Sequence, residues 1–102
     1  MGLTIENEQS PDGSVIRVVG EVDLHSSPEL RKAILKSTSS AKGGLAIDLS
    51  GVTYIDSSGV ATLVEGLRSA RKNDITFVLV APSPAVRQVL ELARLDSVFE
   101  VR

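Results

Sequence analysis

The residues best suited to chemistry are two adjacent hydroxyls beside a carboxylate, at Asp56, Ser57 and Ser58. They follow an apolar run at residues 45–49, typical of a buried strand, and precede a stretch with helical spacing. A helix is therefore predicted to begin here. A side-chain oxygen can cap its free N–H groups, a contact worth about 1 kcal/mol. A serine here can also accept phosphate, because a helix N-terminus tolerates the roughly −1.5 to −2 charges that phosphate brings. Spacing alone leaves both interpretations open.

One apolar stripe predicts the helix that positions these hydroxyls. Apolar residues recur at i, i+3, i+4, i+7 and i+10, namely at Val60, Leu63, Val64, Leu67 and Ala70. A further buried strand is predicted at residues 75–81 and ends before Pro82, since proline cannot donate to a strand ladder. A third helix then begins with a serine followed by a proline at residues 83–84.

Two short strands are predicted near the start of the chain, at residues 3–6 and 15–19. The Ser-Pro-Asp-Gly sequence at residues 10–13 favours a tight turn, so the two strands are expected to be antiparallel. An acidic pair, Glu21 and Asp23, follows the second strand. Such residues are more often solvated, or bonded to nearby N–H groups, than catalytic.

The first helix has two consistent starting points. Ser27 as N-cap places Pro28 at the first helical position, where its missing N–H costs nothing. Ser26 as N-cap would instead form a capping box with Glu29. The polar, Gly-ended octet at residues 37–44 is predicted to close this helix and loop to the next strand.

The predicted order of elements is β-β-α-β-α-β-α, and residues 95–101 are expected to end in a short strand or a turn. This order indicates an α/β fold: a single small domain over residues 1–102, with a mixed, mostly parallel sheet and packed helices. Both Asp23 and Asp56 come after a strand and before a helix. We therefore expect them on one edge of the sheet, the usual place for sites in open α/β sheets.

Composition excludes several classes of function. A net charge of −2, three aromatic residues and no Trp argue against nucleic-acid binding, which calls for a basic face or stacking platforms. The absence of Cys removes disulfide and thiolate chemistry, and the presence of only one His argues against a histidine-based metal site. No signal peptide or run of roughly 20 apolar residues is visible, so we expect a cytoplasmic protein that does not insert into a membrane.

Catalysis is not expected. His25 is the one imidazole available as a base for Ser57 or Ser58. The sequence has no Gly-x-Ser-x-Gly elbow and no Gly-rich phosphate-binding loop. We expect His25 to be a loop residue, and we expect no cofactor.

Three segments, in order, resemble the signatures of STAS domains, especially of the anti-sigma factor antagonists. They are Gly-Glu-Val-Asp at residues 20–23, Asp-Ser-Ser-Gly at 56–59 after Tyr54 and Ile55, and Ser-Pro-Ala-Val at 83–86 followed by Leu95 and Phe99. The resemblance covers nearly the whole chain. It implies that the unphosphorylated protein binds an anti-sigma factor that is also a serine kinase, and so frees a sigma factor. It further implies that this kinase, which brings the ATP and magnesium, phosphorylates Ser57, and that a phosphatase restores the cycle.

The resemblance also implies a partner-binding surface around Ser57, made of Asp23, Ser26, Asp56, Ser58 and Gly59. Asp56 would hold the loop or help the kinase to position the hydroxyl, and Ser58 would cap the helix. Gly59 would let the partner's backbone approach closely.

One position departs from the pattern. Antagonists often have a second Gly two residues after Gly59, where this chain has Ala61. The helix at residues 59–65 also resembles STAS subunits of lipid-transport ABC complexes, which would act as non-catalytic scaffolds on an ATPase subunit. This remains the alternative interpretation.

Overall fold

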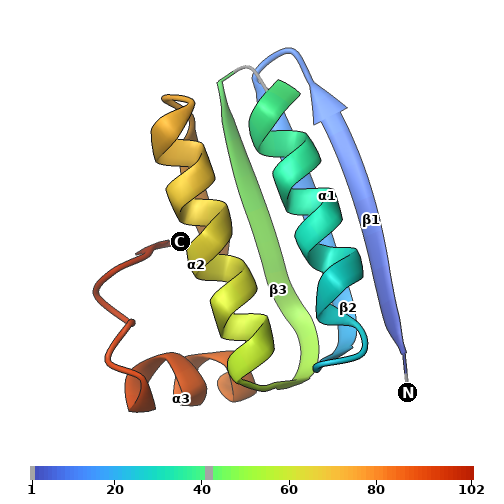
Figure 1. The fold of residues 1–102 in the computed structure, drawn as a ribbon, viewed down its shortest axis with the longest axis vertical. Coiled ribbons are helices and arrows are strands. Elements are labelled where there is room, and N and C mark those ends of the chain that lie inside the picture. Colours follow the sequence, from blue (N-terminus) through green and yellow to red (C-terminus); the bar gives the residue numbers. More distant parts are fainter. Residues whose placement is uncertain (1, 41–42) are drawn as a thin grey trace.

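The computed structural model describes residues 2–40 and 43–102 (Figure 1). In chain order its elements are β1 (Leu3–Ser10), β2 (Gly13–Val22), α1 (Ser27–Ser40), β3 (Gly44–Ile55), α2 (Ser57–Lys72), β4 (Thr76–Val80), α3 (Pro84–Leu92) and β5 (Glu100–Val101). The strands form one sheet in the order β1-β2-β3-β4-β5. β1 is antiparallel to β2, and the remaining pairs are parallel. The predicted α/β fold and element order are confirmed, and the segment before the C-terminus ends in a strand.

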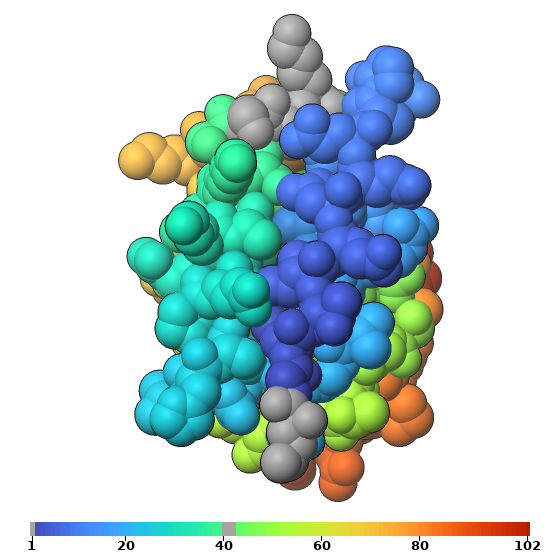
Figure 2. Space-filling view, turned by 90° about the vertical axis from the view of Figure 1, so that its right-hand side faces the viewer, coloured from blue at the N-terminus to red at the C-terminus, as the bar shows by residue number. Residues whose placement is uncertain are grey.

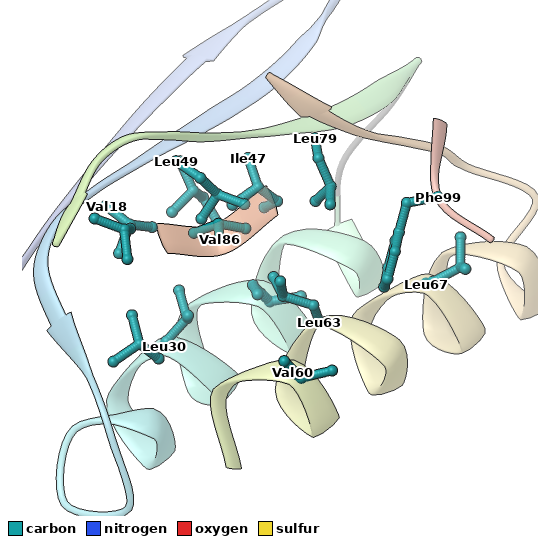
Figure 3. Close-up of a cluster of buried hydrophobic side chains, with 14 of the residues drawn as sticks. Val18, Leu30, Ile47, Leu49, Val60, Leu63, Leu67, Leu79, Val86 and Phe99 are labelled. Atoms are coloured by element: carbon teal, nitrogen blue, oxygen red, sulfur yellow. The ribbon is translucent and has the colours of Figure 1, made fainter. Parts of the chain in front are cut away.

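The core lies between the sheet and the two longer helices, which pack side by side on the same face (Figures 1 and 3). α3 lies at the end of the molecule where β3 ends and α2 begins, and its Val86 belongs to the same core (Figures 1 and 3). The side chains with 1% or less of their surface exposed include Ile16, Val18, Ile34, Ile47, Leu49 and Leu63. None of the helices in the described ranges has the length and apolar character that a membrane crossing requires.

Several predicted boundaries were wrong, because β1, β2, β3 and α1 are all longer than predicted. β3 does not stop at residue 49 but runs to Ile55, and its pairing with β2 is interrupted by two register shifts. β-bulges of this kind let a strand continue while turning its side chains. α1 continues through the polar residues to Ser40, because Thr38 is fully buried and its hydroxyl is bonded to Leu35 O at 3.1 Å and to Ser69 Oγ at 2.7 Å. Part of the predicted loop, residues 41–42, lies outside the described residues.

The face of the sheet opposite α1 and α2, called the open face below, displays the alternate strand residues. On β2 these are Val15, Arg17 and Val19, while Ile16 and Val18 point into the core. Arg17 forms ion pairs there with Glu8 of β1 at 3.2 Å and with Asp48 of β3 at 3.9 Å. The open face is therefore a solvated surface of mixed polarity.

Candidate functional site

Ser57 is the first residue of α2, and its side chain is exposed. Its hydroxyl makes no hydrogen bond to any residue that the structure describes. The hydroxyl is therefore free to rotate and open to a second macromolecule. A phosphoacceptor needs both properties, because the incoming phosphate must approach the oxygen from solvent.

The N-cap of α2 is Asp56. Its backbone is extended, and its Oδ1 accepts hydrogen bonds from the N–H of Ser58 at 3.0 Å and from the N–H of Gly59 at 3.2 Å. The Ser58 hydroxyl donates to the same oxygen at 2.5 Å. The prediction that Ser58 caps the helix was therefore wrong: the carboxylate is the cap, and Ser58 braces it. With both groups engaged, Ser57 is the hydroxyl left free.

A second carboxylate orders the turn after β2. Asp23 Oδ1 accepts from the N–H groups of His25 and Ser26, each at 2.9 Å, and from the Ser26 hydroxyl at 3.2 Å. The single Ser26 hydroxyl proton is shared between that carboxylate and Glu21 O, which is closer at 2.8 Å, and Ser26 Oγ accepts from Asp23 N at 2.9 Å. The hydroxyl of Ser26 is thus used inside the turn. Because the Ser26 N–H is bonded to Asp23, the capping box with Glu29 is not formed.

The two acidic motifs meet at the carboxyl end of the sheet, as predicted. Asp56 N donates to Val22 O at 3.1 Å, which joins the end of β3 to the end of β2. Asp23 lies near enough for its charge to act on Asp56. A hollow of about 270 Å³ lies beside the Asp23 turn and is lined by Glu21 and Glu29 among others. The site is therefore an acidic edge that carries the exposed Ser57 hydroxyl.

Hydrogen bonding holds both aspartates in their ionised form. The Ser58 hydroxyl is the largest influence that lowers the pKa of Asp56, assisted by two backbone N–H groups, while partial burial and the charge of Asp23 oppose it. The backbone N–H of Ser26 is the main cause of the lowered pKa of Asp23. Both carboxylates are charged at neutral pH.

The lowered pKa of Asp56 predicts that the effect of Asp56→Asn on stability depends on pH. Asn can still cap, so the variant removes only the charge-assisted part of the cap, about 0.3–1 kcal/mol. Because the folded-state pKa of Asp56 is lowered, the wild type's advantage is complete above the unfolded pKa of about 3.8. It disappears as pH falls through the lower, folded-state value. Urea unfolding at pH 7 and in strong acid measures this, with the exposed Asp96→Asn as control. A wild-type advantage that persists in strong acid would contradict this account of the cap.

Gly59 has a different role from the predicted one. It is buried, and a Cβ at this position would lie 2.7 Å from side-chain atoms of both Val22 and Ile55. The space above Gly59 thus belongs to the protein's own core, and the prediction that it admits a partner's backbone was wrong. Its lack of a side chain lets the first turn of α2 settle on the ends of β2 and β3.

Gly59→Ala is accordingly expected to destabilise the fold. The clash with two buried branched side chains costs about 1–3 kcal/mol, and the better helix propensity of Ala recovers up to about 1 kcal/mol. Ser57→Ala, in the same helical turn but exposed, should change stability by less than about 0.5 kcal/mol. Chemical denaturation of both variants tests this; equal stabilities would show that the core has room for the methyl group.

The site contains no catalytic arrangement within the described residues. The backbone N–H of His25 binds the Asp23 carboxylate, and the residue is exposed. In the described ranges, no group of three or more His, Asp or Glu side chains could hold a metal ion. The fold and the site together define a small α/β domain whose acidic residues and exposed Ser57 hydroxyl lie at one edge.

The family is shown by comparison. The model of the STAS domain matches residues 4–102, and the chain belongs to this family. It is 30% identical to the anti-sigma-B factor antagonist of Listeria monocytogenes, over the whole of this chain and 90% of that protein. Such relatives are regulatory STAS proteins, not enzymes, and this chain is of the same non-enzymatic kind.

Solved structures of anti-sigma factor antagonists have a fold similar to that of this chain. An anti-sigma factor antagonist from Mycobacterium paratuberculosis superposes with a TM-score of 0.88 at 32% identity, covering 98% of this chain and 85% of that one. The antagonist SpoIIAA in its unphosphorylated form has a TM-score of 0.81 at 24% identity, covering 97% and 88% of the two chains. The latter likeness supports the fold.

Proposed function

We propose that this chain is an anti-sigma factor antagonist controlled by phosphorylation at Ser57. In its unphosphorylated form it binds an anti-sigma factor that is also a serine kinase, and a sigma factor is released in the cytoplasm. Transfer of phosphate to Ser57 causes the complex with the kinase to dissociate, and a phosphatase reverses the modification.

One observation carries the proposal: of the two adjacent serines, Ser57 is exposed and unbonded, whereas Ser58 is bound to the N-cap. The surrounding loops are fixed by hydrogen bonds, so the free hydroxyl is presented on a rigid support. The kinship with anti-sigma factor antagonists supplies the class of partner.

The similar proteins described above are anti-sigma factor antagonists. They therefore favour this function over the alternative, a subunit of a lipid-transport ABC complex. The departure at Ala61 does not weaken this interpretation. Ala61 is exposed on α2, and Ala is a better helix former than Gly.

The test is direct phosphate transfer. Small anti-sigma serine kinases of the source genome are purified, each is incubated with this protein and ATP, and the modified residue is located by mass spectrometry. We expect one phosphate, on Ser57, and none on the Ser57→Ala variant. Phosphate on Ser58 instead, or on no serine with any kinase, would refute the proposed switch.

A further inference from the structure

Large apolar side chains gather on the surface around the Ser57 edge. Within the described ranges, the exposed large hydrophobic residues are Val19, Leu24, Tyr54, Leu92 and Val98. Leu24 is 71% exposed, Tyr54 is 50% exposed and Val19 is 49% exposed. These three lie near the carboxyl ends of β2 and β3, where Ser57 also lies. Single exposed apolar residues need no explanation, but three at one edge indicate a contact surface.

Tyr54 and Val19 lie together on the open face. Val19 pairs with Gly51 and Glu21 pairs with Tyr54, so the two apolar side chains are diagonal neighbours on adjacent strands. Gly51 has no side chain, and a Cβ there would come within 2.9 Å of Val19 Cγ2. The register shift between Gly20 and Glu21 turns Tyr54 toward the open face beside the edge. In Figure 2 the ends of β2 and β3 adjoin on the right, next to the orange atoms of α3.

Leu24 is held on a rigid turn. It follows Asp23, whose carboxylate accepts from the N–H groups of His25 and Ser26, and Ser27 N donates to Asp23 O at 2.8 Å. These bonds fix the backbone on both sides of Leu24 while its side chain stays in solvent. An exposed leucine whose backbone is already ordered loses little conformational entropy on binding.

The charge around these residues indicates the partner's chemistry. The edge carries four carboxylates, on Glu21, Asp23, Glu29 and Asp56. Residues 20–30 and 53–62 contain no Lys or Arg. A protein that docks here needs basic residues around an apolar contact, because unpaired like charges across an interface cost affinity.

We propose that Leu24 and Tyr54, with Val19 diagonal to the tyrosine on the neighbouring strand, anchor the anti-sigma kinase to this edge, and that basic residues of the kinase surround that contact. The inference rests on the proposed function for the identity of the partner. It adds that affinity comes from an apolar contact outside Ser57, so the switch residue and the anchoring residues are separate. Tyr and Leu side chains suit this role because they bury large apolar areas.

The experiment titrates each purified candidate kinase with the wild type and with single variants. ADP is present instead of ATP, so that no phosphate is transferred. Leu24→Ala and Tyr54→Ala should each weaken binding about tenfold or more, because each removes a buried contact at the interface. Tyr54→Phe should keep most of the affinity, since it retains the ring. Leu92→Ala changes an apolar residue that is 78% exposed at the C-terminal end of α3, and it should leave the affinity within about twofold. Thermal unfolding checks that every variant is folded.

The outcomes separate the two proposals. If Ser57 accepts phosphate but Leu24→Ala and Tyr54→Ala bind like the wild type, the proposed anchoring role of Leu24 and Tyr54 is wrong. The proposed phosphorylation switch at Ser57 is then unaffected. If both variants weaken binding but no phosphate appears on Ser57, the anchors stand and the switch is wrong. If the wild type binds none of the kinases, both proposals fall.

Discussion

Phosphate on Ser57 is expected to weaken binding of the anti-sigma kinase by at least about a hundredfold. The hydroxyl lies at an acidic edge beside Asp56 and Asp23, which are both ionised. A phosphoserine adds about −1.5 to −2 charges in this place. Burying such a charge without a partner costs several kcal/mol, and about 2.8 kcal/mol already corresponds to a hundredfold change in affinity.

Steric and electrostatic effects act together here. In the complex the kinase must hold the phosphate donor at the Ser57 oxygen, so the product faces the phosphates that remain on the nucleotide. The phosphate group also needs room that a close-fitting interface lacks. The weaker binding of the phosphorylated protein therefore does not require repulsion by side chains of the kinase. Those side chains are expected to be basic at the rim of the contact.

Three forms make the measurement decisive. Ser57→Ala should bind like the wild type and take up no phosphate, and Ser57→Asp should weaken binding in the direction of the phosphorylated protein. Ser97→Asp adds the same charge to an exposed residue before β5 and should change little. Calorimetric titration of each form, and of the phosphorylated wild type, gives the affinities. If Ser57→Ala and Ser57→Asp both bind as tightly as the wild type, the switch is wrong for this protein.

Leu63→Ala is expected to have the largest effect on stability, a loss of about 2–5 kcal/mol. Leu63 lies in α2 and is fully buried; its side chain points into the space between the sheet and the helices (Figure 3). Removing its branched end leaves a cavity that the surrounding residues fill only in part. A domain of this size has about 5–15 kcal/mol in total, so a large share of the stability is lost.

The chain offers a matched control for this substitution. Leu92→Ala removes the same atoms from a side chain that is 78% exposed, and it should change the free energy of unfolding by less than about 0.5 kcal/mol. Urea unfolding followed by circular dichroism measures both. Comparable losses in the two variants would show that burial at Leu63 does not govern stability, contrary to the packing described.

The sequence by itself determined most of the architecture. Hydrophobic periodicity distinguishes the strands from the helices, because a strand alternates with period 2 and a helix with period 3.6. Local chemistry marked the start of α3, where Ser83, the serine before Pro84, caps the helix by accepting from Val86 N at 3.3 Å. The order of elements placed Asp23 and Asp56 on the same edge, since parallel neighbouring strands end together. These features depend on short-range interactions and on topology, which residue types express directly.

Only the tertiary structure decided how the residues at the edge divide their tasks. Asp56, Ser57 and Ser58 could each have been the cap by residue type, and the three-dimensional path of the loop assigns it to Asp56. Gly59 resembles a surface glycine in sequence, but Ile55 at the end of β3 and Val22 at the end of the distant β2 lie against it. Tyr54 belongs to an apolar run, and a register shift with β2 turns it outward. The positions of Gly59 and Tyr54 depend on Val22 and Glu21 in β2, more than 30 residues earlier in the chain, which spacing within a motif does not report.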